Sequence, residues 1–277
     1  MITYSPDSCT LCGMCAGICH EGCITIDRDS LSIDHSMCST CTQCIAICPQ
    51  QALSWDQIPP QRFQTSNLPT PQQLDELFRQ RRTVRSFKSQ RLDRETIESI
   101  IQTGILAPTN NYALRVVAVN DDAAVAELNR LAARVLRTIY NLVYRHKIIF
   151  GLLKRLTPGI QEKDKVKLEA GLEREITFDK STAVLFIIGE IQIAHSDASA
   201  QYALANMMYY AQAMGLGTRL SGGGKILLGN NRQARRLLGL QKGEHILGVL
   251  EVGYPAVKFL NKVQGKFLPV EWLTIPE

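Results

Sequence analysis

Cysteine is missing from most of this 277-residue sequence, because all nine cysteines lie before Pro49. This distribution does not suit a disulfide framework, so we expect a reducing, cytoplasmic compartment. The sequence also lacks an apolar run of about 18 residues, which argues against a transmembrane helix. Its first residues lack the basic start and the apolar stretch of a signal peptide.

After residue 60, acidic residues are fewer than basic ones, with 20 Asp and Glu against 30 Lys and Arg. Residues 1–60 show the opposite balance, with six acids and a single base, Arg28. Opposite net charges on two covalently joined modules favour their docking.

Eight of the nine cysteines follow one spacing, C-x2-C-x2-C-x3-C, which begins at Cys9 and again at Cys38. Thiolates at this spacing can converge on one cubic [4Fe-4S] cluster, while the fourth cysteine of each run serves the other cluster. The pattern predicts two clusters with crossed ligands: Cys9, Cys12, Cys15 and Cys48 for one, and Cys38, Cys41, Cys44 and Cys19 for the other.

Residues 1–60 resemble a bacterial two-cluster ferredoxin. Both ligand runs match, and the departure is His20 after the first run, where the second run has Pro49. Structural zinc is the alternative for paired C-x2-C motifs, but it takes four ligands in isolated groups, and two cysteine triplets leave odd ligands over. The pattern therefore favours electron transfer.

Cys23 stands outside both runs. Superposing the second run on the first places Cys23 at Ala52, and residues 24–26 and 53–55 also match. A small buried thiol is the simplest interpretation. A regulatory or replacement ligand is the alternative, although nothing nearby marks the thiol as activated.

Helices and strands alternate beyond the cysteine runs. Four prolines between Ile58 and Pro71 are typical of a linker. The spacing of apolar residues then predicts helices from Pro71, after Asp93 and over 200–214, and strands over 116–119, 183–188 and 246–252. Helices that alternate with buried strands indicate an α+β or α/β domain. We expect three parts: a cluster domain (1–57), a linker (58–71) and a larger domain of helices and strands (72–277).

Five short motifs follow one another in the second domain: 81–87, 107–111, 214–218, 237–240 and 253–255. The first packs three guanidinium groups and a hydroxyl into a short stretch, and guanidinium forks bind phosphate. A solvated basic helix end is the alternative for this motif alone. The ordered set resembles the nitroreductase superfamily of FMN-dependent oxidoreductases, specifically its members with an N-terminal ferredoxin, over residues 72–273.

The resemblance implies an α+β fold, with a two-cluster ferredoxin domain joined to a domain that has a central sheet flanked by helices, and it implies an FMN site. The family's R-x-[ST]-x-[RK] phosphate motif falls on Arg81, Thr83 and Arg85, with Arg82 adjacent. The family's loop along the flavin and its ribityl chain falls on Pro108, Thr109, Asn110 and Asn111, without the Asn-x-Gln pair that many relatives have next.

Relatives present backbone N–H groups to flavin N5 and O4 from the position of Ser221, Gly222 and Gly223. Glycines allow such a close approach to a planar ring, and a flexible turn is the alternative. The basic residue that usually reaches the phosphate after the Gly-Tyr-Pro turn is not an Arg here. Lys262 is the favoured substitute, with Lys258 and Lys266 as other candidates.

No acidic residue occurs between Asn129 and Gln161, where seven Lys and Arg residues stand among apolar residues at helical spacing. The pattern predicts a basic amphipathic helical insert near residues 130–160. The superfamily commonly has a lid over the flavin here, so we interpret the insert as a lid or dimer surface. Contact with an anionic membrane surface is the alternative. No nucleic-acid partner is expected, because no recognition motif is present.

These features predict an iron-sulfur flavoprotein oxidoreductase that passes electrons from two [4Fe-4S] clusters to FMN and on to a small organic acceptor. The resemblance implies a nitroaromatic, quinone or activated C=C acceptor and a homodimer. A ferredoxin-like protein or NAD(P)H is the expected electron donor, and no side chain can be named as the catalytic acid. The alternatives are a redox-sensing module, or an electron-transfer module that docks a partner protein.

Overall fold

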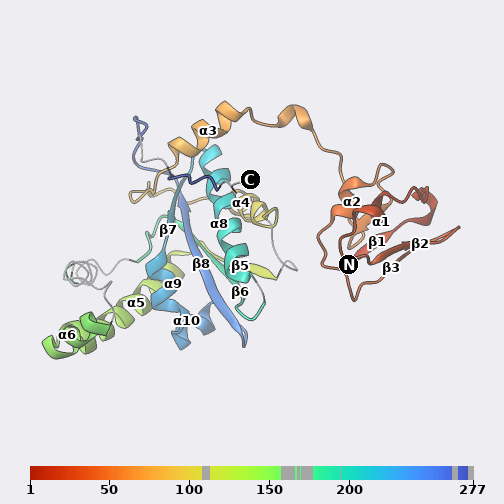
Figure 1. The fold of residues 1–277 in the computed structure, drawn as a ribbon. Coiled ribbons are helices and arrows are strands. Elements are labelled where there is room, and N and C mark those ends of the chain that lie inside the picture. The colour runs from red at the N-terminus through yellow and green to blue at the C-terminus, as the bar shows by residue number, and fades with distance from the viewer. Residues whose placement is uncertain are drawn as a thin grey trace. The chain divides into compact units, whose positions relative to one another are not determined.

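The computed structural model describes residues 1–107, 113–156, 166, 169, 177–193, 195–263 and 268–273. The chain divides into two compact units (Figure 1). The N-terminal unit takes in Met1–Pro69, and the C-terminal unit takes in Thr70–Pro108 and Leu114–Glu277.

The N-terminal unit contains the same structural repeat as its cysteine runs. Strand β1 (Ile2–Tyr4) pairs with β4 (Leu53–Trp55), and β2 (Ile24–Ile26) pairs with β3 (Leu31–Ile33), both antiparallel. Two short helices, α1 (Met14–Ile18) and α2 (Gln43–Ile47), follow the first cysteines of each run. Elements β1, α1 and β2 correspond in order to β3, α2 and β4, at the sequence offset that separates Cys9 from Cys38.

The core of this unit is small and rich in sulfur. Four aliphatic side chains are buried together with three thiols: Ile2, Ile24, Leu31, Leu53, Cys15, Cys23 and Cys44. A unit of this size buries little apolar surface, and domains this small usually draw stability from metals or cross-links as well.

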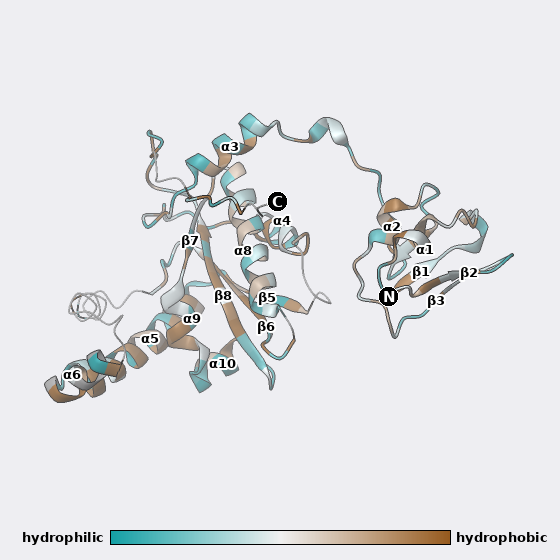
Figure 2. Ribbon diagram, in the orientation of Figure 1, coloured by the Kyte–Doolittle hydropathy of each residue, from teal (hydrophilic) through white to brown (hydrophobic). Residues whose placement is uncertain are grey.

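The C-terminal unit is built on a four-stranded antiparallel sheet in the order β5-β6-β8-β7. Its strands are β5 (Leu114–Val119), β6 (Ala183–Glu190), β7 (Gly217–Leu220) and β8 (Glu244–Gly253). The two central strands are almost completely buried, and β8 is coloured apolar over the middle of its length in Figure 2. Helices cover both faces, which confirms the predicted α+β fold of this part of the chain.

Alternation along β6 supplies both halves of the core. Leu185 and Ile187 pack on one face with α4 (Arg94–Gly104) and α8 (Ser196–Ala213). Val184 and Phe186 pack on the other face with α5 (Asp122–Ile139), α9 (Gly222–Gly229) and α10 (Arg232–Leu237). The sheet is therefore the middle of three layers.

Side-chain caps begin the helices where the sequence predicts them. Helix α3 (Pro71–Gln80) has a capping box, in which Gln73 N–H donates to Thr70 Oγ1 at 3.2 Å. The Asp93 carboxylate accepts from Thr96 N–H at 2.7 Å and begins α4. Helix α8 begins at Ser196, one turn before the predicted start, because Ser196 and Ser199 are buried along with the apolar residues.

The basic insert is helical but not one continuous α-helix. Helix α5 ends at Ile139 and is followed by a π-helical turn (Tyr140–Tyr144) and then by α6 (Lys147–Leu156). Leu128 and Leu131 of α5 are buried in the core, whereas Leu142, Ile148 and Leu156 are more than half exposed. Within the described residues, no helix has the length and apolarity needed to cross a membrane.

One ion pair on the sheet gives a testable pH dependence. Arg115 of β5 binds Glu244 of β8 through two hydrogen bonds of 2.7 and 2.6 Å, and this lowers the pKa of the Glu244 carboxyl to about 2. A lowered pKa means that the pair stabilises the fold above the unfolded-state pKa and loses this effect as the pH falls through about 2.

We therefore expect Glu244→Gln to lower the free energy of unfolding at pH 7 by about 1 kcal/mol, because solvent screens the 40% exposed Arg115 side chain. Urea unfolding at pH 7 and pH 3 would measure the difference from the wild type. If the difference in free energy of unfolding between the wild type and Glu244→Gln does not become smaller at pH 3, the ion pair with Arg115 is not its cause.

Candidate functional site

Two cavities in the N-terminal unit are lined by cysteines. The larger, of about 250 Å³, is lined by Cys19, Cys38, Cys41 and Cys44, with Cys23 beside them. The smaller, of about 10 Å³, is lined by Cys9, Cys12, Cys15 and Cys48. Each cavity thus has three cysteines of one run and the last cysteine of the other. This is the division that the spacing predicts.

The backbone curls around each cavity in the same way. Leu11 and Gly13 have positive φ in the first cysteine loop, and Thr40 and Thr42 have it at the equivalent positions of the second loop. The third cysteine of each run then lies in the first turn of a short helix. In the part of the chain that the structure describes, no group of three His, Cys, Asp or Glu side chains is placed to hold a single metal ion.

The cysteine surroundings are apolar. Burial raises the pKa of the Cys15 thiol, and it raises the pKa of Cys44 to about 11. A thiolate at these two positions is stable when a bound cation compensates its charge. The donor set is soft and anionic, which suits iron better than Mg²⁺ or Ca²⁺.

Cys23 and Cys19 are in direct contact, with their Sγ atoms 3.3 Å apart. Burial, followed by the hydrogen bond with Cys19, raises the pKa of Cys23 to about 12. Burial acts against ionisation of Cys19 too, but the Cys23 thiol and nearby backbone N–H groups outweigh it and lower the pKa of Cys19. The two sulfur atoms are therefore within hydrogen-bond distance of each other, and either thiol can donate.

In the C-terminal unit, the arginine motif lies along β7 as an extended segment. Val84 N–H donates to the Thr218 carbonyl at 3.0 Å, and Thr83 and Thr218 form a parallel bridge. The contact is close, because a Cβ on Gly217 would lie 2.8 Å from a Val84 methyl carbon. The motif is thus held beside the first residues of β7.

A cavity of about 340 Å³ opens beside this segment. Arg82, Lys258 and Lys262 line it together with Gly217, whereas Arg81, Thr83 and Arg85 are not among its lining residues. Successive residues of an extended segment point to opposite sides, so Arg82 and Val84 share the side of the cavity. The structure therefore brings the predicted Lys262 together with Arg82, but not with the other three motif residues.

Positive charge dominates this cavity. Lys262 forms an ion pair with Glu76, which lowers the pKa of that carboxyl. The Arg82 guanidinium donates to the carbonyls of Arg79 and Arg81 at 2.7 and 2.8 Å, which fixes its direction. Among the described residues, Arg79 and Lys258 bring the number of cations that line the cavity to four. The cavity suits an anion such as a phosphate group.

The predicted glycine segment begins a helix and is not a flexible turn. Ser221 caps α9 by accepting from Gly224 N–H at 3.2 Å. Gly222 and Gly223 are exposed, and a Cβ at either position would meet nothing within 4 Å. Their N–H groups belong to the first turn, which lacks intrahelical acceptors. The extended chain from Gly217, the first residue of β7, to Ser221, just after its last residue, covers about 13 Å. The cationic cavity and these N–H groups therefore lie at the two ends of the strand.

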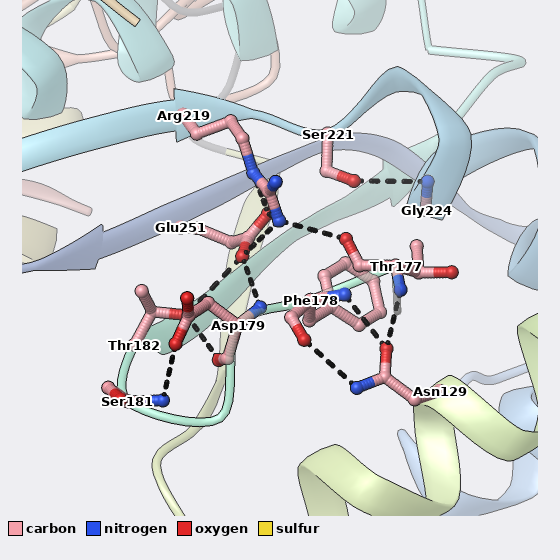
Figure 3. A network of polar contacts seen from close by, with 10 residues as sticks. All are labelled: Asn129, Thr177, Phe178, Asp179, Ser181, Thr182, Arg219, Ser221, Gly224 and Glu251. Carbon is pink, nitrogen blue, oxygen red and sulfur yellow. Dashed lines mark hydrogen bonds and ion pairs between the residues drawn. The ribbon is translucent and has the colours of Figure 1, made fainter. Parts of the chain in front are cut away.

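A polar network holds the α9 end of β7 in place (Figure 3). The Arg219 guanidinium donates to both carboxylate oxygens of Glu251, each at 2.7 Å, and to the Thr177 carbonyl at 2.9 Å. Asn129 of α5 accepts from Phe178 N–H at 2.8 Å and donates to its carbonyl at 2.9 Å. The Phe178 ring packs under α9 so closely that a Cβ on Gly224 would lie 2.7 Å from it.

Some predicted residues lie outside the described part of the chain, namely Pro108, Thr109, Asn110 and Asn111 of the loop, and Lys266. Sequence reasoning missed the network residues Asn129, Arg219 and Glu251. Glu251 was the available signal, because a single carboxylate within an apolar strand requires a buried partner.

Comparison with known proteins places this arrangement in a family. A model described as "Nitroreductase family" matches residues 78–254. A comparison with curated proteins gives no match.

Solved structures whose descriptions name FMN are similar to about three quarters of the chain. A nitroreductase from Desulfitobacterium hafniense with bound FMN is 16% identical, with a TM-score of 0.54, over 71% of this chain and 97% of that one. An FMN-dependent nitroreductase from Clostridium difficile is 17% identical, with a TM-score of 0.52, over 73% and 100%. Iodotyrosine deiodinase bound to FMN and 3-iodo-L-tyrosine is 19% identical, with a TM-score of 0.54, over 73% and 100%. At these identities the likeness shows a shared fold.

Proposed function

Because this chain belongs to the nitroreductase family and is an FMN-dependent oxidoreductase of that type, we propose that its FMN lies along β7. The observation that carries the proposal is the pair of features at the ends of this strand. A cavity lined by four cations lies at one end, and the first-turn N–H groups of a helix lie about 13 Å away at the other. An elongated ligand with an anionic end and a planar acceptor end fits both.

The cationic cavity would hold the phosphate. Arg82 and Lys262 line it, and Lys258 and Arg79 add charge at its wall. A role in phosphate binding is also proposed, from the motif alone, for Arg81, Thr83 and Arg85. Their side chains belong to the other side of the extended segment. Pro108, Thr109, Asn110 and Asn111 also stay proposals from the motif.

The N-terminus of α9 would face the flavin ring. Backbone N–H groups of Ser221, Gly222 and Gly223 can donate to N5 and O4, and the helix dipole adds positive potential there. Both effects favour a negatively charged reduced ring. FMN, when bound, supplies the exchange between one-electron and two-electron chemistry.

The phosphate assignment predicts that Lys262→Gln and Arg82→Gln each weaken FMN binding about 10- to 100-fold. A lost charge-assisted hydrogen bond costs about 1.5–3 kcal/mol, which corresponds to this range. Fluorescence titration of the apoprotein with FMN would measure the dissociation constant. The control is Lys242→Gln. Lys242 is exposed and lies just before the first residue of β8, whereas the cavity lies near the last residue of that strand. Equal effects of Lys242→Gln and Lys262→Gln would remove the assignment.

For the N-terminal unit we propose two [4Fe-4S] clusters, one in each thiol cavity. Support comes from the donor chemistry and from the way in which the cavities divide the eight predicted ligands. The 250 Å³ cavity is roomy, whereas the thiols around the 10 Å³ cavity have to spread apart before a cluster fits. Such clusters carry single electrons.

The complete proposal is an iron-sulfur flavoprotein that passes electrons from the clusters to FMN and on to a small organic acceptor. Nitroaromatics, quinones and activated C=C compounds are the proposed acceptor classes, and a ferredoxin-like protein or NAD(P)H is the proposed donor. We propose a homodimer in the cytoplasm. A redox-sensing or partner-docking module would bind both cofactors without turning over an acceptor.

Anaerobic purification with iron and flavin analysis tests the proposal directly. We expect about eight irons and one FMN per chain. Visible absorption should show a broad iron-sulfur band beneath the flavin peaks. FMN without iron would keep the family assignment and remove the cluster unit, and zinc in place of iron would do the same.

A further inference from the structure

Cys23 is a fifth thiol at a cavity for which four ligands are already assigned. Its side chain is 6% exposed and lines the same cavity as Cys19, Cys38, Cys41 and Cys44. Its Sγ lies 3.3 Å from Cys19 Sγ, and Cys38 is a second thiol within its reach. Both contacts are with proposed ligands of one cluster.

The internal repeat provides a comparison within the same chain. In the second half, Ala52 N–H donates to Cys48 Sγ at 3.3 Å. At the equivalent position of the first half, the N–H of Cys23 is one of the backbone groups that lower the pKa of Cys19. The backbone donors therefore match, and the Cys23 thiol is an addition on one side. Of the described residues that line the smaller cavity, four are cysteines and the counterpart of Cys23 is Ala52.

We propose that Cys23 is a positioning residue that donates an S–H hydrogen bond to the Cys19 ligand and so raises the reduction potential of the cluster held by Cys19, Cys38, Cys41 and Cys44 above that of its twin. This inference rests on the proposed two-cluster unit. One-electron reduction adds a negative charge to the cluster and its thiolates, and a hydrogen-bond donor stabilises that charge. Cys23 keeps its proton, since a further thiolate beside four others would meet strong repulsion.

The consequence is that two nearly identical clusters become inequivalent. With both clusters bound, the Cys23 thiol would favour reduction of the cluster beside it before reduction of the cluster beside Ala52. An enzyme whose flavin needs electrons in pairs gains an ordered store of two. The elements of the two halves match in order, and the pair Cys23 and Ala52 is the difference that places a thiol beside a proposed ligand on one side and not on the other.

Three single variants of the full-length protein test this inference. Cys23→Ala removes the donor, Cys23→Ser restores one, and Ala52→Cys adds a thiol at the equivalent position of the other half. Each is titrated anaerobically with dithionite and followed by electron paramagnetic resonance. In Cys23→Ala we expect one of the two reduction steps to move to lower potential. The ratio of reduced to oxidised cluster at a fixed potential should fall roughly three- to tenfold, where tenfold corresponds to about 59 mV for a one-electron couple.

The other variants keep the result interpretable. Cys23→Ser should return the shifted step toward its wild-type position, and Ala52→Cys should raise the other step. Two unchanged steps in Cys23→Ala, with the full iron content, would overturn the inference. Iron content in an additional variant, Cys19→Ala, tests whether Cys23 is itself the ligand. Loss of four irons in Cys23→Ala, with the full iron content retained in Cys19→Ala, would show that Cys23 and not Cys19 binds the cluster, and would overturn the inference. A wild-type chain without iron would instead refute the proposed two-cluster unit itself.

Discussion

Replacing Arg219 with Met is expected to lower the free energy of unfolding of the C-terminal unit by about 3–5 kcal/mol at pH 7. The Glu251 side chain is 0% exposed, and Arg219 supplies two of its hydrogen bonds at 2.7 Å. Without Arg219, the carboxylate keeps the Asp179 N–H at 2.9 Å and a long contact with Thr182 at 3.4 Å. These neutral groups do not balance a buried charge.

The pH dependence of this variant follows from the pKa of Glu251. Burial already raises that pKa in the wild type, although Arg219 acts against the shift. Removing Arg219 raises it further. A carboxyl whose folded-state pKa lies above its unfolded value destabilises the fold at high pH, and the cost disappears as the pH falls below the unfolded value. Arg219→Met should therefore recover stability, relative to the wild type, between pH 7 and pH 4. Urea unfolding across this range measures it.

Arg115→Met is the matched control. Arg115 also binds a glutamate of β8 through two hydrogen bonds, but its side chain is 40% exposed. Its loss should cost about 1 kcal/mol. A second comparison is Arg219→Met combined with Glu251→Leu, which should be more stable than Arg219→Met alone because no buried charge is left. Equal costs for Arg219→Met and Arg115→Met would contradict the burial argument.

Function should respond to Arg219→Met as well. The network fixes Phe178, and the Phe178 ring packs directly under Gly224. A looser segment at Phe178 frees the first turn of α9, whose N–H groups are the proposed ring contacts. Weaker FMN binding should therefore accompany the loss of stability, although Arg219 is absent from the residues that line the cationic cavity.

The parts of the C-terminal fold that the sequence predicts are those whose signal is local. Six consecutive apolar residues indicate β6, and the Thr70 and Asp93 caps begin helices where expected. Helix α9 was missed because three consecutive glycines disfavour a helix on their own. Packing against Phe178 and the Ser221 cap form this helix, and the packing joins segments remote in sequence.

In the candidate site too, local sequence patterns predict some features, and contacts between remote segments determine the others. Cysteine spacing is enough to predict which thiols line a common cavity, because the repeat fixes the local geometry. The phosphate motif identifies a segment that borders the cationic cavity, but it does not say which side chains share a face. That choice is made when Val84 pairs with Thr218, which turns Arg82 toward the cavity. The pairing joins two segments that are far apart in the chain, and the sequence pattern carries no signal for it.

The largest expected effect on the cofactors comes from pairs of cysteine replacements. If the clusters have crossed ligands, Cys48 and Cys9 serve one cluster while Cys48 and Cys38 serve two different clusters. Cys48→Ala with Cys9→Ala should then retain about four irons per chain, as Cys48→Ala alone does. Cys48→Ala with Cys38→Ala should retain almost none. Iron analysis after anaerobic purification reads the result directly.

If each cysteine run instead holds its own cluster, the prediction is reversed. The iron contents of the two double variants therefore distinguish crossed ligands from ligands of a single run, without a structure of the bound clusters. The cavities favour the crossed result, because Cys48 lines the one that contains Cys9, and Cys38 lines the other. Cys23→Ala is the matched control, since it removes a buried cysteine from the larger cavity and should leave about eight irons. Retention of four irons when Cys48 and Cys38 are both replaced would show that each run holds its own cluster.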